Sequence, residues 1–419
     1  MSPFLLSIGN ILALASASIA FISFILLFRQ KHPPLPPGPT SIPLIGNLLI
    51  VPQKRLHLKY TEWAKTYGDV FRLKVMNNTI IVINTPTLVH KVFDLKSVSS
   101  SNRPKSIIAG MIAPNNVHMA TGRYANDTWK SSRKAAAYAL SPESVKARSA
   151  YQYAEATQLM NDLLHSPEPI YGQRGPTLQY PDIADFMNVH PRYVEALKMG
   201  TLPPVDLFPF LALVPKRWAK WKQTVEHIRH LQHSLYDRLL SKVEHRLAKE
   251  ESERGALMEY AIHHASKLGI NSREHLLTAS YLGSVLLEGS ESCSAALQNI
   301  VYAFILHPHC QRKVQMEIDS VVGAGRAPTF DDIPKLKYML AFIEEAFCNH
   351  FRPVGPLGLS YEMTKDEVID GHLYPKGAAV FMNICMNFCT PNLLSRYSVA
   401  GAMGHDERYF DKLEEFIPD

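Results

Sequence analysis

The sequence predicts a mainly α-helical globular body with a small β-sheet portion, preceded by a single transmembrane helix. Three observations support this fold class. Residues 4–28 are mostly apolar and carry no charge, residues 80–83 form a β-branched run, and apolar residues recur every three or four positions over residues 221–247. These patterns are typical of a membrane span, a strand and an amphipathic helix, respectively.

The predicted transmembrane anchor covers residues 1–30. Its uncharged run of about 25 residues rises about 1.5 Å per residue in a helix, which is enough to cross a hydrocarbon layer of about 30 Å. A cleaved signal peptide is the alternative, but its apolar region usually has only about 7 to 15 residues. Arg29 and Lys31 follow immediately, and such flanking positive charge favours the cytosolic side. We therefore expect a membrane-anchored protein whose body faces the cytosol.

A proline-rich hinge follows at residues 31–43. Prolines fix the backbone φ angle and lack an N–H donor, so the segment cannot be helical and should form a stiff, extended spacer. We expect this spacer to hold the body, residues 44–419, away from the bilayer. The body contains no Gly/Ser-rich linker that would divide it, and one large unit is the simpler interpretation.

Composition excludes several classes of protein. The chain is 46% hydrophobic, which is enough for a sizeable core and argues against disorder. Its net charge of +6 is spread without a long basic block, so we expect no nucleic-acid partner, although a mild attraction to anionic membranes is compatible with it. The five cysteines are an odd number scattered late in a large chain, which argues against a disulfide framework.

The periodic segment at residues 221–247 contains no Pro or Gly and predicts one long amphipathic helix whose apolar stripe packs on the core. The same helix carries His227, His230 and His233, a grouping that invites a metal-site interpretation. Their positions drift around the helix, and no Glu or Cys completes a tetrahedral set. A solvated polar face is therefore favoured, and we expect no metal ligands here.

A second long helix is predicted to begin at Asn271, with Glu274 in a capping position, and to end at Leu306, before Pro308. It is apolar on most sides, so we expect it to be buried. Residues 288–292 (Glu-Gly-Ser-Glu-Ser) interrupt the apolar pattern with two acids, a glycine and two hydroxyls. Gly/Ser pairs are known sites of helix distortion, so a distorted helix is predicted there.

Four motifs occur together in one order. They are the Leu-Pro-Pro-Gly-Pro sequence at residues 35–39, the pair Trp129 and Arg133, the interrupted helix at residues 288–292, and the Phe-Arg-Pro-Val-Gly-Pro-Leu-Gly sequence at residues 351–358. Each motif alone is weak. Together they resemble a eukaryotic microsomal cytochrome P450, most like the fungal secondary-metabolism members, over the whole chain. The resemblance also implies that residues 370–377 form a hairpin before a buried strand at residues 378–382.

The resemblance implies a haem-thiolate monooxygenase in the endoplasmic reticulum membrane. Such an enzyme takes electrons from NADPH–cytochrome P450 reductase and oxidises an apolar small molecule. It further implies that Trp129 and Arg133 hydrogen-bond a haem propionate, and that Glu291 and Ser292 relay protons to bound dioxygen. The plainer alternatives are a core tryptophan beside an arginine in a surface salt bridge, and a Gly/Ser kink with a solvated glutamate.

The carboxyl region departs from the family pattern. Cys348 stands three residues after Glu345, where the family has an arginine that pairs with the glutamate, and residues 385–401 intervene in an otherwise faithful match. We interpret residues 385–401 as translated intron. The loop that supplies the proximal cysteine is not reached, and Cys385 and Cys389 fit free cysteines better than iron ligands. The P450-like fold is therefore expected to be C-terminally incomplete.

Three functions remain open from the sequence. The first is the haem-thiolate monooxygenase, and the second is a truncated, haem-free inactive pseudoenzyme or mis-spliced gene product. The third is a membrane-tethered helical binding protein without redox chemistry, which no residue pattern positively favours. Residues 165–202 also look shortened and poorly patterned, because prolines and glycines occur where the family has regular helix.

Overall fold

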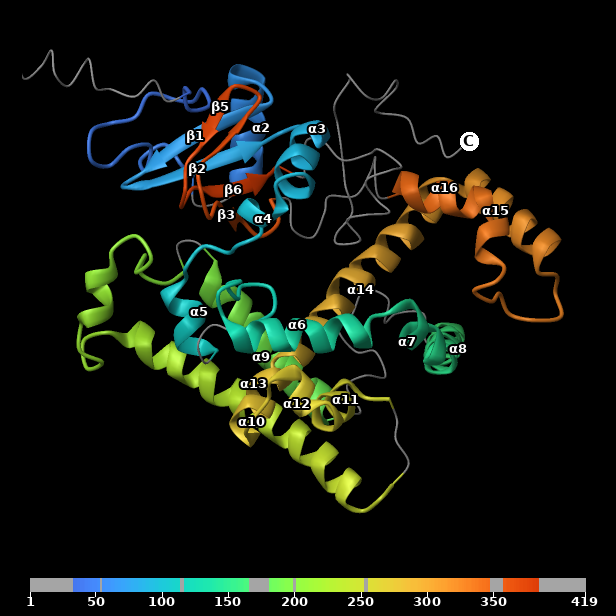
Figure 1. Ribbon diagram of the computed structural model, residues 1–419. Coiled ribbons are helices and arrows are strands. Elements are labelled where there is room, and N and C mark those ends of the chain that lie inside the picture. Colours follow the sequence, from blue (N-terminus) through green and yellow to red (C-terminus); the bar gives the residue numbers. More distant parts are fainter. Residues whose placement is uncertain are drawn as a thin grey trace, which may run out of the picture.

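The computed structural model describes residues 33–52, 55–113, 117–165, 181–198, 201–251, 255–346 and 357–383 (Figure 1). It shows a sheet-containing part, built from the two ends of the described chain, beside a larger helical part. The mainly helical class with small sheets is confirmed. The described helices contain none that is long and apolar enough to cross a membrane, and the predicted anchor at residues 1–30 lies outside them.

The main sheet has four strands in the order β1-β2-β6-β3. Its strands are β1 (Val70–Val75), β2 (Asn78–Ile83), β3 (Tyr361–Glu362) and β6 (Ala379–Met382). Strands β1 and β2 form an antiparallel hairpin, while β2 pairs in parallel with β6, so that Ile80 lies opposite Ala379. The predicted strand at residues 80–83 and the buried strand near residues 378–382 are both confirmed, and the parallel pairing joins them.

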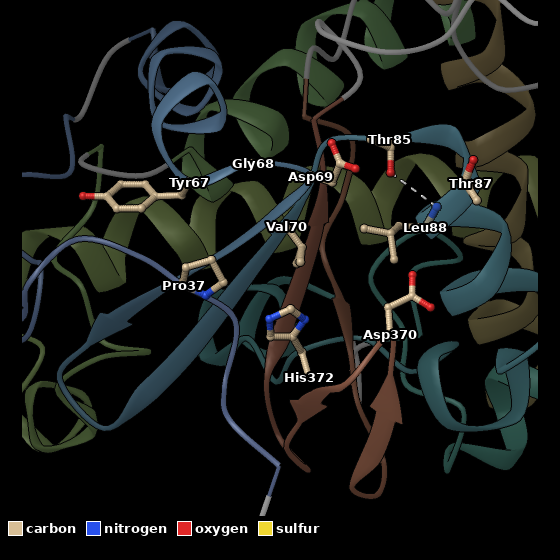
Figure 2. A pocket seen from close by; sticks show the side chains of 10 residues that line it. All are labelled: Pro37, Tyr67, Gly68, Asp69, Val70, Thr85, Thr87, Leu88, Asp370 and His372. Carbon is tan, nitrogen blue, oxygen red and sulfur yellow. Dashed lines mark hydrogen bonds between the residues drawn. The ribbon is translucent and has the colours of Figure 1, made fainter. Parts of the chain in front are cut away.

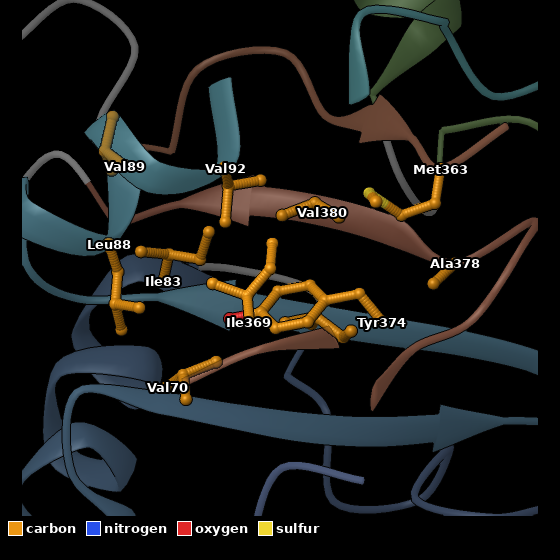
Figure 3. Close-up of a cluster of buried hydrophobic side chains, with 11 residues drawn as sticks. Val70, Ile83, Leu88, Val89, Val92, Met363, Ile369, Tyr374, Ala378 and Val380 are labelled. Carbon is orange, nitrogen blue, oxygen red and sulfur yellow. The ribbon is translucent and has the colours of Figure 1, made fainter. Parts of the chain in front are cut away.

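A second sheet is the hairpin of β4 (Glu367–Ile369) and β5 (His372–Tyr374). Asp370 and Gly371 form its turn with φ angles of 47° and 78°, a left-handed pair that an Asp-Gly sequence adopts readily. The hairpin implied at residues 370–377 is therefore confirmed at its turn. Figure 3 shows apolar side chains from both sheets meeting in one core, where Ile369 and Tyr374 lie against Ile83 and Val380.

The proline-rich segment is extended where the structure describes it, from residue 33 onward. It runs along the two sheets. The Pro37 carbonyl accepts a hydrogen bond from Arg72 N of β1, and the Pro34 carbonyl accepts one from Leu373 N of β5. The extended backbone thus agrees with the prediction, but this part of the segment docks on the body and does not stand away from it.

The helical part is built around α10, which confirms the predicted helix at residues 221–247. The helices of the first half are α2 (Leu56–Tyr67), α3 (Pro86–Val89), the π-helix η1 (His90–Asp94), α4 (Ser97–Ser100), α5 (Ile107–Ile112), α6 (Asp127–Ala139), α7 (Pro142–Ala147) and α8 (Ser149–His165). Those of the second half are α9 (Pro181–Leu197), the 3₁₀ helices η5 (Pro209–Leu213) and η6 (Ile333–Lys335), α10 (Lys220–Ala248), α11 (Leu257–His263), α12 (Ala265–Leu268), α13 (Arg273–Ser280), α14 (Leu282–Leu306), α15 (Pro308–Val321) and α16 (Lys337–Glu345).

Helix α10 buries Val225, Ile228 and Leu235 of its predicted apolar stripe. Helix α9 packs against it, within the poorly patterned residues 165–202, of which residues 166–180 lie outside the described part of the chain. The helix forms despite an internal proline, Pro191, because Phe186, Val189, Tyr193 and Ala196 give it a buried apolar face.

The second predicted helix differs from the expectation at its start, in its continuity and in its burial. Its N-cap is Ser272, whose hydroxyl accepts from His275 N, and the helix is divided at Tyr281 into α13 and α14. Helix α14 then continues through residues 288–292, where distortion was predicted. The prediction of burial on most sides is wrong for its second half, because Leu297 and Ile305 are 53% and 61% exposed. In Figure 1 this half leads away from the helical part toward α15 and α16.

Candidate functional site

Helix α6 carries two of the predicted site residues, Trp129 and Arg133. Asn126 caps the helix by accepting a hydrogen bond from Trp129 N at 3.1 Å, which fixes the first turn. Ala135, Ala136 and Ala139 are buried and let the helix approach its neighbours α11 and α13. The start of α6 is thus held at both its cap and its packing face, so Trp129 and Arg133 occupy defined positions.

The Trp129 indole is buried, with 6% of the residue exposed. Its Nε1–H donates to the Met119 carbonyl at 3.0 Å. Gly122 faces the ring so closely that a Cβ atom at this position would lie 2.1 Å from Trp129 Cδ1. The indole N–H, predicted to bind a haem propionate, is therefore occupied by a backbone carbonyl in this structure, and the propionate role of Trp129 stays a prediction.

Arg133 is exposed and lies one helical turn after Trp129, with its guanidinium carbon 5.4 Å from the centre of the indole ring. The structure shows no acidic partner for it among the described residues. The plainer alternative for the pair, an arginine in a surface salt bridge, is therefore not what the described residues show. An exposed guanidinium above an aromatic ring remains available to an anionic ligand.

A second arginine, Arg103, lies close enough to Arg133 for the two charges to interact. Burial lowers the pKa of Arg103, the nearby Tyr361 phenol opposes this, and the positive charge of Arg133 lowers the pKa further. The guanidinium of Arg103 stacks on the Tyr361 ring, 3.9 Å from its centre, and donates to the carbonyls of Leu359 and Ser360. Neutral carbonyls and a ring hold it, and no described carboxylate pairs with it.

A third arginine, Arg123, differs from Arg103 and Arg133 because a carboxylate pairs with it. Arg123 pairs with Glu362 at 2.6 Å, and the same carboxylate accepts from Asn102, so the charge of Arg123 is neutralised by strand β3. Arg103 and Arg133 keep their positive charges near one another without such compensation. Two uncompensated guanidinium groups repel each other, and an anion between or beside them would relieve that repulsion.

Sequence reasoning missed Arg103. It precedes Pro104 in an irregular segment that shows no periodic pattern and lies 26 residues before Trp129. The contacts that hold Arg103 come from residues 359–361. No local signal in the sequence links these two distant segments.

Glu291 and Ser292, the predicted proton relay, lie on α14. The placement of their side chains is outside what the structure describes, and the relay stays a prediction. The same holds for Cys348, Cys385 and Cys389, and for residues 385–401, which all lie outside the described residues. Of the described cysteines, Cys293 is exposed on α14 and Cys310 is buried in α15.

Two of the described residues, Arg103 and Arg133, would suit the propionate edge of a haem. Propionates are carboxylates, and the Arg103 and Arg133 guanidiniums are uncompensated, planar donors that suit them. The described residues contain no group of three His, Cys, Asp or Glu side chains arranged to hold a metal ion. The fit therefore concerns the propionate edge of the cofactor and does not identify a ligand for its iron.

Figure 2 shows a separate cavity of about 550 Å³, which lies between the Pro37 ring, the segment 67–70, the start of α3 and the turn of the β4–β5 hairpin. Two acidic residues, Asp69 and Asp370, line it, and Asp370 is paired with Lys91 at 2.7 Å. None of the predicted site residues lines this cavity. We therefore place the candidate site at Arg103, Trp129 and Arg133.

Comparisons with known proteins identify the family to which the chain belongs. The family model described as Cytochrome P450 matches residues 36–169 and 168–393. A cytochrome P450 monooxygenase of Armillaria gallica is 31% identical, over 97% of this chain and 76% of the relative. Similar enzymes of Aspergillus niger (29% identical, 99% of this chain and 77% of the relative) and Aspergillus clavatus (30%, 97% and 76%) also match. The chain belongs to the cytochrome P450 family.

Proposed function

We propose that this protein is a haem-thiolate monooxygenase that oxidises an apolar small molecule in fungal secondary-metabolite biosynthesis. When bound, the haem would supply the activation of dioxygen from which one oxygen atom enters the substrate. The observation that carries the proposal is the pair of uncompensated guanidiniums, Arg103 and Arg133, beside Trp129 in a chain of the cytochrome P450 family. The resemblance of its four sequence motifs to fungal secondary-metabolism members supports the pathway class.

The chain's own residues would have separate roles in binding and in proton transfer. Arg103 and Arg133 bind and orient the propionates through charge-assisted hydrogen bonds, and the rigid cap at Asn126 keeps Arg133 in place. Trp129 supports Arg133 from below through its ring face. Glu291 and Ser292 would pass protons into the site, because a carboxyl group and a hydroxyl can each accept and donate a proton in turn.

The proposal includes a location and a partner. Residues 1–30 would anchor the protein in the endoplasmic reticulum membrane, with the body in the cytosol, as the uncharged run and the following Arg29 and Lys31 suggest. NADPH–cytochrome P450 reductase would deliver the electrons.

The first test is haem incorporation. The chain is expressed with haem precursors, both alone and extended into the downstream reading frame, and the absorbance of the reduced, carbon-monoxide-bound form is recorded. A thiolate-haem band supports the proposal. Absence of any bound haem in both folded versions would overturn it and favour the alternative of a haem-free inactive pseudoenzyme.

The second test concerns the arginines. Arg103→Gln and Arg133→Gln should each weaken haem retention about tenfold or more, because each removes a charge-assisted contact to a propionate. Arg217→Gln is the matched control, since Arg217 also stacks on a tryptophan, Trp218, at 4.4 Å. Haem retention is measured by transfer to apomyoglobin, and thermal unfolding checks that each variant is folded. Equal haem loss from the control and the two site variants would contradict the assignment.

A further inference from the structure

A groove of about 550 Å³ lies between helices α9 and α10 and is separate from the proposed haem site. We call it the α9–α10 groove. Its lining is largely apolar: Ala196 and Ile228 are buried and belong to the packed faces of the two helices, while Pro191 and Leu202 add apolar surface nearer the solvent. Figure 1 shows the two helices crossing in the helical part of the molecule.

Two potentially cationic side chains meet at the edge of this groove. The Arg192 guanidinium of α9 donates to Nε2 of His227 on α10 at 3.3 Å. Because an arginine has no acceptor atom, this geometry requires His227 Nε2 to act as an unprotonated acceptor. Neither side chain contacts a carboxylate among the described residues. A neutral imidazole forms a weaker hydrogen bond with an arginine than an anion does.

The nearest acid does not compensate Arg192. Glu195 also lines the groove, but its carboxylate pairs with Lys198 at 2.6 Å and accepts from the Thr201 hydroxyl. The hydrogen bond from Lys198 is the main cause that lowers the pKa of Glu195, with that from Thr201 next. The charge of Glu195 is therefore matched by Lys198, and the groove keeps the positive charge of Arg192.

We infer that the α9–α10 groove binds an amphiphilic carboxylate, a single apolar chain that ends in a carboxylate group. The carboxylate would replace His227 as the partner of Arg192, and the planar guanidinium can donate to both of its oxygens. The apolar chain would cover Pro191 and Leu202, which keep solvent-accessible apolar surface, and remove that surface from water. A pocket of this size, apolar with a few convergent polar groups, is typical of small-molecule sites.

His227, the partner that the carboxylate would replace, is one of the three histidines that the sequence places on an exposed helix face. His227, His230 and His233 are all exposed, but only His227 lines the groove. None of Arg103, Trp129 and Arg133 lines it. The inference therefore does not rest on haem binding and can hold or fail independently of the proposed function.

The experiment uses the full chain in amphipol, with amphipol alone as the blank. A decanoate analogue with a photoreactive diazirine in its chain is crosslinked, and the labelled peptides are identified by mass spectrometry. The expected label lies on peptides from α9, α10 or residues 201–202. Excess decanoate should suppress it, whereas decanol, with the same chain and no charge, should compete at least about tenfold less well.

Variants assign the label to the groove. Arg192→Gln should lower labelling about tenfold, and Arg192→Lys should retain most of it because a positive charge remains. His230→Gln is the matched control on the same helix and should label like the unchanged protein. The inference is overturned if Arg192→Gln labels as strongly as the unchanged protein, if decanol competes as well as decanoate, or if the label falls on other helices. Haem content is measured in parallel and should be the same in all variants.

Discussion

Gly122 offers the most direct test of the geometry around Trp129. An alanine at this position would place its Cβ atom 2.1 Å from Trp129 Cδ1, 2.7 Å from Trp129 Nε1 and 2.9 Å from the His118 carbonyl oxygen. Real Cβ atoms do not approach other atoms so closely, so the indole or the backbone must move. Gly122 has no left-handed φ angle, which means that steric overlap alone makes Gly122→Ala unfavourable.

The cost has two parts. Overpacking a well-filled core typically costs about 1–3 kcal/mol. A displaced indole also loses its hydrogen bond to the Met119 carbonyl, which contributes about 1 kcal/mol to stability. We therefore expect Gly122→Ala to lower the free energy of unfolding by about 2–4 kcal/mol.

The measurement is urea denaturation of the full chain, followed by circular dichroism. Gly325→Ala is the matched control, because no atom lies within 4 Å of the Cβ that it would add, and its effect should stay within about 0.5 kcal/mol. If Gly122→Ala and Gly325→Ala unfolded at the same urea concentration, Gly122 would not be packed against Trp129 and the described geometry of the site would be wrong.

Two further predictions concern buried charges. Burial alone would raise the pKa of Glu367, but hydrogen bonds, the strongest from Lys96, lower it from 4.5 to about 2. The ionised Glu367 side chain therefore contributes its full stabilisation of the fold above about pH 4.5, and this contribution is lost as the pH falls toward 2. Glu367→Gln should destabilise the chain in urea at pH 6 but much less at pH 2.5, and an equal effect at both values would contradict the shift. Arg246→Met leaves the buried Glu259 without its guanidinium partner and should cost about 3–5 kcal/mol, with partial recovery in the double variant Arg246→Met, Glu259→Met. A single variant as stable as the unchanged chain would show that the pair is not buried.

Periodic patterns predicted the regular parts of the fold well. The long helix α10 and the strand at residues 80–83 were found because their side chains repeat with the helical period or share β-branching. The burial of the second half of α14 was predicted wrongly. An apolar sequence favours burial of a helix, but it does not determine which other elements pack against that helix. The poor patterning of residues 165–202 was inferred from prolines and glycines at residues 167–176, which lie outside the described residues, whereas residues from Pro181 onward form the regular helix α9.

The candidate site was predicted only in part. Trp129 and Arg133 share one helix, four residues apart, so a local pattern reveals them. Arg103 depends on carbonyls and a ring more than 250 residues away, and no pattern in a single sequence encodes that contact. The hydrogen bond between the Trp129 indole and Met119 was also unpredictable, because it depends on how the irregular segment before α6 folds back.

The parallel pairing of β2 with β6 has a consequence for synthesis of the chain. Asn84 and Asn383, which hydrogen-bond next to this pairing, are 299 residues apart. At about 5–20 residues per second, a ribosome would need roughly 15–60 s to make the intervening segment. During that time the outer edge of β2, with its run of isoleucine and valine, has no strand to cover it. We expect chaperone binding to nascent chains to be concentrated on β2 until residues 379–382 emerge.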